Sequence, residues 1–273
     1  MTESIVNGYL TFCVFAFGAC IGSFLNVCIW RLPREESVIS PGSHCPHCQQ
    51  PIAWFDNIPL VSYLILNARC RRCGGKIAPR YFLVELLTAV LFTLVWLQYG
   101  LDGRTPIYGL MVAGLILGTF VDFDHMIIPD RVTLGGCVAG LVLSPLAPKL
   151  HDQLTAWGGE REALIGLVVG AGLLWLVSLI GKLIFRKDAM GLGDVKLLGG
   201  MGALLGWRAV LFIIMVSSFT GALVGTYLIV RRGREWQSRI PYGPYLALAA
   251  VLWVLGGREL WNTYLLWLGG GHL

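Results

Sequence analysis

Two pairs of cysteines lie near each other in the first third of the chain, each with the spacing C-x2-C. Cys45 and Cys48 form the first pair and Cys70 and Cys73 the second, with 21 residues between the pairs. Four thiolates in this pattern suit one tetrahedral Zn²⁺ ion. Taken alone, C-P-H-C is also typical of a thiol–disulfide redox site, which requires a thiol of lowered pKa. The second pair favours zinc, and four protein ligands leave such an ion no open position for catalysis.

The neighbouring histidines and the other cysteines have plainer explanations. His44 and His47 could replace a thiolate at the metal, but they are also ordinary residues of a solvated loop. The remaining cysteines lie in apolar runs, where a thiol behaves as a small packing residue; they are Cys13, Cys20, Cys28 and Cys137.

A second group of candidate residues is acidic and lies at the ends of apolar runs. In GTFVDFDHMIIPDR, Asp122 is the deepest carboxylate, with Asp124 nearer the water. Pro129 disfavours helix at the residue before it, so the chain is expected to turn there and Asp130 to cap the next helix. An aspartate at mid-bilayer costs about 2.5–3.5 kcal/mol on insertion scales, so such residues are functional candidates.

The stretch MGLGDVKLLGG supplies the partner carboxylate. Asp194 follows Gly191 and Gly193, which allow another backbone to approach closely. If Asp122 and Asp194 meet in a site of low dielectric, one keeps its proton and the other acts as a base. The alternative is that both are helix-end residues, paired with Arg131, Lys196 or lipid headgroups. Glu85 is a further candidate, with pairing to Arg80 or Lys76 as its alternative role.

The elements that position these residues are predicted to be membrane helices. Of the 273 residues, 56% are hydrophobic and 14% are charged, which is typical of a membrane protein rather than a soluble one. A span needs about 20 mostly apolar residues. Eight helices are expected, at 8–30, 81–99, 106–123, 131–147, 163–185, 194–206, 209–230 and 241–256. The patch at 260–269 is too short to span and is expected at the interface.

The basic residues predict the orientation of these helices. Most of them follow the first run, cluster near 182–196, or lie at 231–239 between the last two runs. The positive-inside rule then places the N-terminus outside and the loop 31–80 in the cytoplasm. The net charge of +5 needs no nucleic-acid partner, because a basic inner face meets anionic lipid. Basic residues follow rather than precede the first run, which favours a retained helix over a cleavable signal peptide.

The expected organisation is therefore all-α and polytopic. A first transmembrane helix covers 1–30, a small cytoplasmic zinc-binding loop domain covers 31–80, and a transmembrane bundle carrying the acidic site covers 81–273. The loop is too small for a stable core of its own, so zinc would serve as its staple. The sequence has no serine nucleophile elbow and no H-E-x-x-H, and GAGLLW at 170–175 is typical of helix packing.

These motifs, in this order, resemble the type IV prepilin peptidases, bifunctional leader peptidase/N-methyltransferases of bacterial inner membranes. The resemblance covers nearly the whole chain: GSFLNVCIWRLP, the two C-x2-C pairs, VDFDHMIIPD, G-L-G-D at 191–194 and PYGPYLALA. G-x-G-D marks a class of membrane aspartyl proteases. Presenilin-like members share it, but P-Y-G-P stands here where a P-A-L segment would be expected.

The resemblance implies a function and a set of roles. Asp122 and Asp194 would be catalytic, ahead of Asp124 and Asp130, and the four paired cysteines would bind one structural zinc. Such enzymes remove the basic leader of prepilins and pseudopilins of type IV pilus or type II secretion systems, after a glycine at the cytoplasmic face. They then methylate the new N-terminal residue with S-adenosylmethionine, for which no residue in the sequence suggests a site.

Other readings remain open at this point. One is a peptidase without methyltransferase activity. Another is a membrane thiol oxidoreductase using Cys45 and Cys48, which would keep its activity without the aspartates. A third is a transporter or assembly scaffold with a zinc-stapled loop, whose aspartates would bind protons or cations.

Overall fold

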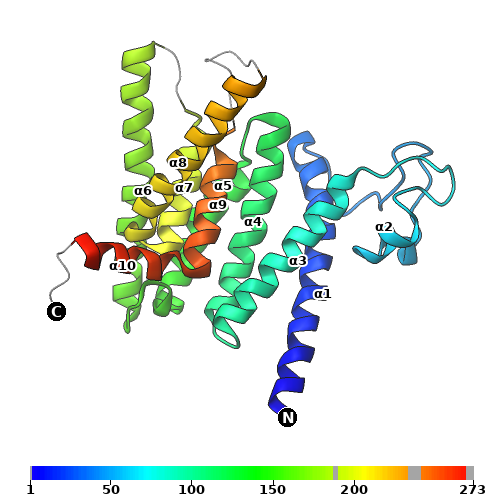
Figure 1. Ribbon diagram of the computed structural model, residues 1–273, viewed down its shortest axis with the longest axis horizontal. Coiled ribbons are helices and arrows are strands. Elements are labelled where there is room, and N and C mark those ends of the chain that lie inside the picture. The colour runs from blue at the N-terminus through cyan, green and yellow to red at the C-terminus, as the bar shows by residue number, and fades with distance from the viewer. Residues whose placement is uncertain (1, 187–189, 233–240, 269–273) are drawn as a thin grey trace. The chain divides into compact units, whose positions relative to one another are not determined.

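The computed structural model describes residues 2–186, 190–232 and 241–268, and their regular structure is helical (Figure 1). The α-helices are α1 (Thr2–Arg31), α2 (Val61–Ile65), α3 (Pro79–Tyr99), α4 (Arg104–His125), α5 (Asp130–Leu146), α6 (Ala156–Phe185), α7 (Leu192–Leu205), α8 (Trp207–Arg232), α9 (Gly243–Leu252) and α10 (Arg258–Leu268). Short irregular helices join them: η1 (Leu32–Arg34), η2 (Trp54–Asn57), η3 (Pro148–His151) and η4 (Trp253–Gly257).

The predicted all-α membrane architecture is confirmed. Each apolar run expected to form a helix does so, and the patch at 260–269 corresponds to α10. Within the described ranges, five helices are long and apolar enough to cross a membrane: α1, α3, α4, α6 and α8. The expected count of eight spans is approximate, because α5, α7 and α9 have 17, 14 and 10 residues. Much of the basic cluster at 231–239 lies outside the described residues.

The chain divides into two compact units, Met1–Leu117 and Gly118–Leu273, which we call the N-terminal and C-terminal units. The division expected from the sequence, with boundaries at 30 and 80, stays a prediction.

In the N-terminal unit, α1 packs along α3 at very short range. A Cβ atom on Gly18 would lie 2.9 Å from the Cα of Ala89, so only glycine permits this approach. At the end of α1, the buried Arg31 donates from its two terminal nitrogens to the carbonyls of Ser37 (2.8 Å) and Pro41 (2.7 Å). These bonds fix the path by which the chain leaves the helix and enters the loop.

In the C-terminal unit, α7 is the central helix and packs against α5, α6, α8 and α9. Val195 and all its residues from Leu197 to Leu205 are buried. Glycines allow α6 to touch its backbone: a Cβ on Gly166 would overlap the carbonyl oxygen of Gly202, and one on Gly170 would lie 2.5 Å from the carbonyl oxygen of Leu198. Small residues at a helix interface permit such contact, which fixes the position of α7.

A polar corner holds the far end of α7. Ser144 Oγ lies 2.8 Å from His151 Nε2 and donates to the carbonyl oxygen of Ala203 at 3.2 Å, with both side chains buried. Because the Ser144 hydroxyl is used as a donor, Nε2 of His151 must donate to it. Burial, and secondarily the positive charge of Arg258, lower the pKa of His151 to about 4. The imidazole is therefore neutral at physiological pH.

Candidate active site and metal centre

The four paired cysteines form one cluster in the N-terminal unit. The sulfurs of Cys45, Cys48, Cys70 and Cys73 all lie within 4.8 Å of one another. A tetrahedral zinc with Zn–S bonds of about 2.3 Å separates its sulfurs by about 3.8 Å. The sulfurs of Cys45 and Cys73 are 3.8 Å apart. The donor set and its spacing therefore fit zinc, and the cluster can hold it.

Two hairpins of the same design carry the cysteine pairs. Isolated β-bridges join His44 to Pro51 and Arg69 to Lys76, so each bridge begins one residue before its pair and closes three residues after it. In each hairpin the residue after the second cysteine has positive φ: 57° for Gln49 and 67° for Gly74. A left-handed residue closes a tight turn and points backbone N–H groups toward the sulfurs.

The surroundings act unequally on the four thiols: desolvation and hydrogen bonds with the other cysteines raise the pKa of Cys73 to about 11. Backbone N–H groups of Cys73 and Arg72 donate to the Cys70 sulfur and lower the pKa of this thiol to about 6. A thiolate is the form that binds a metal. The two candidate histidines face carbonyl oxygens instead, since His44 Nδ1 lies 3.3 Å from Gly42 O and His47 Nε2 lies 3.3 Å from Lys76 O.

The segment between the hairpins is tied to them and to α3. Arg71 forms a two-pronged ion pair with Asp56 of η2 (2.7–3.1 Å), which lowers the pKa of that carboxyl. Glu85, a buried residue of α3, accepts a hydrogen bond from the backbone N–H of Leu60 at 2.8 Å. Glu85 therefore anchors the loop to α3.

Asp122 lies near the end of α4 and is 5% exposed. Its Oδ2 accepts a hydrogen bond of 3.2 Å from the backbone N–H of Gly243. Gly243 is the first residue of α9, so the positive end of that helix faces the carboxylate. A Cβ on Gly243 would lie 2.8 Å from the same oxygen. Glycine is therefore the residue that fits here.

Asp194 lies in the first turn of α7, three residues after its N-cap Gly191. The N–H of Gly191 donates back to the Asp194 carboxylate, as the acidic residue of a capping box does. Gly193 faces Ile128, whose Cβ would be 3.4 Å from a Cβ on that glycine. The G-x-G-D pattern thus starts the helix and admits a close neighbour.

The two aspartates come from segments far apart in the sequence and converge in the C-terminal unit. Asp194 lies close enough to Asp122 for their charges to interact. Buried Ile128 fills the space beside them, because it faces both Gly193 and Gly243. An uncharged hydrocarbon at this point lowers the local dielectric, which strengthens that interaction.

The other acidic candidates are placed differently. Asp124 is exposed on the last turn of α4. The expectation that Asp130 caps α5 is wrong, because Pro129 is the N-cap and Asp130 is the first helical residue. Lys196 pairs with Asp130 at 2.7 Å. Pro129 itself occupies the N-cap position, so the helix begins at the next residue and Asp130 lies inside its first turn.

Gly243 is the residue of this site that sequence reasoning missed. The sequence draws attention to the segment P-Y-G-P, but nothing in it predicts a contact with a carboxylate 121 residues earlier. The signal was a glycine between two prolines at a helix start. The neighbouring Tyr242 hydroxyl lies 2.7 Å from Ser217 Oγ and ties this turn to α8.

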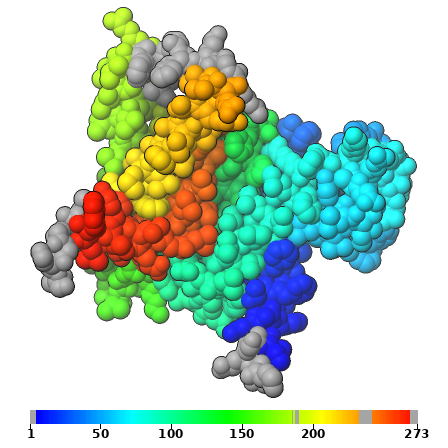
Figure 2. All heavy atoms as spheres, in the orientation of Figure 1, coloured from blue at the N-terminus to red at the C-terminus, as the bar shows by residue number. Residues whose placement is uncertain are grey.

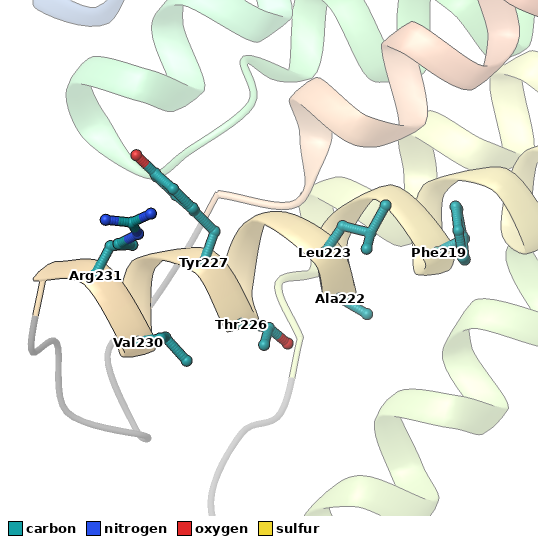
Figure 3. Close-up of a pocket in the computed structure, with 7 residues that line it drawn as sticks. All are labelled: Phe219, Ala222, Leu223, Thr226, Tyr227, Val230 and Arg231. Carbon is teal, nitrogen blue, oxygen red and sulfur yellow. The ribbon is translucent and has the colours of Figure 1, made fainter.

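An open groove of about 450 Å³ runs along one face of α8 (Figure 3). Phe219, Leu223, Tyr227 and Arg231 are among its lining residues, and neither aspartate is. Its lining comes from one apolar helix face. Such a face is expected to contact lipid, so we do not assign the chemistry to this groove.

Comparison with known proteins identifies the chain's relatives. Residues 16–99 match the bacterial peptidase A24 N-terminal domain, and residues 109–226 match the type IV leader peptidase family. A prepilin leader peptidase/N-methyltransferase of Aeromonas hydrophila is 38% identical over 276 residues, covering 92% of each chain. The chain belongs to the type IV leader peptidase family.

Further relatives of this family agree. A protein of the same name from Pseudomonas aeruginosa is 35% identical over 94% of each chain. Another, from Myxococcus xanthus, is 40% identical over 86% of this chain and 69% of its own length. No solved structure matches the chain. The family comprises aspartyl proteases, so the expectation of an enzyme of this class is confirmed.

Proposed function

We propose that this enzyme removes the basic leader peptide of prepilins or pseudopilins, using Asp122 and Asp194 as its catalytic pair. The observation that carries the proposal is the convergence of two aspartates from separate helices beside one buried isoleucine. The names of the relatives support the substrate class. The cut would follow a glycine at the cytoplasmic face of the bacterial inner membrane, with the N-terminus of the enzyme outside.

The hydrogen bonds of the two carboxylates suggest different roles. Asp122 accepts an N–H from Gly243 at a helix N-terminus, and both features stabilise a negative charge. We therefore assign Asp122 as the base and Asp194 as the member that holds the shared proton. Two carboxylates that interact in this way rarely ionise together.

The reaction then follows from these roles. Asp122 accepts a proton from a water molecule, whose oxygen attacks the carbonyl carbon of the scissile bond. Asp194 donates its proton toward the carbonyl oxygen, where negative charge develops. The tetrahedral intermediate collapses with cleavage of the C–N bond: the proton on Asp122 passes to the leaving amine, and the former carbonyl oxygen returns its proton to Asp194 as the carboxylic acid forms. Basic residues of the leader remain on the cytoplasmic side.

The second proposed activity is methylation of the new N-terminal amine, often that of phenylalanine, with S-adenosylmethionine as donor. Its support is the name of the relatives, prepilin leader peptidase/N-methyltransferase, and no residue is assigned to the donor. Zinc at the four cysteines would hold the loop together, since all four coordination positions are filled by protein. The assembly partners proposed are type IV pilus or type II secretion systems.

The test is a cleavage assay in membranes with a leader-bearing prepilin. The parent enzyme is compared with Asp122→Asn and Asp194→Asn, while N-methylation of pre-cleaved pilin is followed in parallel. Asp124→Asn is the matched control, because it makes the same change on the exposed side of α4.

We expect both dyad variants to lose at least about 10²-fold in cleavage, the usual contribution of a general acid or base. The control should cleave normally, and methylation should persist in all three. Full cleavage by either dyad variant would contradict the assignment. A parent enzyme that cleaves no prepilin would refute the proposed substrate class.

A further inference from the structure

The loop between α1 and α3 exposes an unusual amount of apolar surface. Trp54 is 81% exposed, Leu64 63% and Ile65 67%. In α2 the exposed residues Val61, Leu64 and Ile65 fall at positions i, i+3 and i+4, which form one helix face. Ser62, between them, is buried and donates to the carbonyl of Phe55 at 3.0 Å. The polar side of this segment thus faces the loop, and its apolar side faces outward.

Two contacts hold this segment against the side of α3. The N–H of Leu60 donates to the buried carboxylate of Glu85 at 2.8 Å. The rings of Tyr63 and Phe82 lie 5.1 Å apart, centre to centre. Figure 1 shows the loop as a lobe beside the second half of α1 rather than beyond its end.

These contacts set the position of the segment along α3. α3 begins at Pro79, and Glu85 lies six residues further along. At 1.5 Å per residue, Leu60 is therefore held about 9 Å along the axis of this helix from its start. Amphipathic elements that lie in a membrane surface bury their apolar face about 5–10 Å into the headgroup and acyl boundary. With the start of α3 at the membrane surface, the position set by Glu85 corresponds to such a depth.

The residues around α2 are also of types that commonly lie at a membrane–water interface. Tyr81 and Leu83, which flank Phe82 in the chain, are also exposed, on a helix able to span the membrane. Trp54 and Trp30 are both largely exposed, as aromatic residues at a membrane–water boundary commonly are. Arg69 and Arg72 are exposed in the second cysteine hairpin and complement anionic headgroups. Figure 2 shows this lobe in cyan, open to the outside in this view.

We propose that residues 54–65 insert into the lipid interface, so that the cysteine-rich loop is a membrane-surface domain rather than one standing in water. The partner is the bilayer itself, with an acyl-chain contact for α2 and anionic headgroups for the basic hairpin. This inference does not depend on the proposed peptidase chemistry.

Photo-crosslinking of the full chain in its native membrane tests the proposal. A benzophenone amino acid replaces Leu64 or Ile65 in turn, and adducts are identified by mass spectrometry with and without added prepilin. The control carries the same probe at Gln49, an exposed residue of the first cysteine hairpin. A zinc content equal to that of the parent shows that each variant has folded.

Lipid adducts at Leu64 and Ile65 should exceed those at Gln49 by about tenfold, because only the α2 face meets acyl chains. Equal lipid yields at the three positions would overturn the proposal. Adducts to residues 118–268 of the same chain would show that the face is covered within the protein. If the main adducts were to prepilin, the α2 face would be a substrate-docking surface, and the proposal of lipid contact would be wrong.

Discussion

The metal centre and the aspartate site are built in opposite ways. The four cysteines lie in two hairpins that each close within eight residues, and each hairpin is held by its own bridge. The aspartate site joins Asp122, Asp194 and the backbone of Gly243, which come from three helices separated by long stretches of chain. The first site is local in sequence, whereas the second exists only after the C-terminal unit has packed.

This difference has a physical consequence. Metal binding can organise the hairpins by itself, because the ligand-binding free energy acts directly on the fold of the loop. The carboxylates are positioned by helix packing, which includes the close backbone contacts along α7 and the contact of Asp122 with Gly243. We therefore expect the metal centre to respond to its own ligands alone, and the aspartate site to respond to distant packing changes.

The largest effect is expected on removing a zinc ligand. Cys70→Ser should abolish zinc binding, whose apparent free energy is about 10–16 kcal/mol in small structural sites. Elemental analysis of the purified enzyme should fall from one zinc per chain to none. Cys13→Ser, at an exposed thiol of α1, is the control and should keep its zinc. Retention of zinc by Cys70→Ser would contradict the view that the metal centre depends on its own four ligands.

The next effect concerns the packing of α7. Gly166→Ala forces a methyl group into the carbonyl oxygen of Gly202 and should destabilise the enzyme by about 3 kcal/mol or more. Gly172→Ala on the same helix meets nothing within 4 Å and should leave stability nearly unchanged. Thermal unfolding in detergent measures both. Cleavage should fall only in the first variant, and equal behaviour of the two would show that α7 is not held as described.

A smaller effect is expected from acid, through His151. Its pKa is about 4 in the folded protein, against about 6.5 in an unfolded chain. Between these values the unfolded chain binds more protons, so stability falls as the pH drops from 6.5 toward 4. The full loss is about 3 kcal/mol. The stability of His151→Gln, measured by thermal unfolding at several pH values, should fall less than that of the parent between pH 6.5 and pH 4. An equal fall in both proteins would exclude this histidine as the source of the acid sensitivity.

The smallest effect is expected at the carboxylate itself. Gly243→Ala adds a methyl group 2.8 Å from Asp122 Oδ2 and should shift this oxygen. We expect about a tenfold loss in kcat, with KM little changed. Displacement of a catalytic group by a fraction of an ångström weakens its stabilisation of the transition state more than substrate binding. Gly221→Ala is the matched control, since its methyl group would meet Tyr245 at an ordinary 3.8 Å. A change in KM alone would argue against a positioning role.

The sequence by itself determined the membrane class, the helical runs and the cysteine ligands. Apolar runs predict helices because the bilayer leaves backbone polar groups no other partner, and C-x2-C pairs predict a metal centre because their spacing is local. The short helices α5 and α7 were also predicted, but hydropathy alone cannot distinguish a full span from a shorter buried helix.

Only the tertiary structure decided what depends on contacts between distant segments. It placed Gly243 against Asp122, paired Lys196 with Asp130, and anchored Leu60 to Glu85. None of these pairs can be predicted from a periodic or local sequence pattern. The two partners are far apart in the chain and meet only when their segments pack together. Backbone donors and glycine contacts carry no side-chain signal in a sequence, so packing alone reveals them.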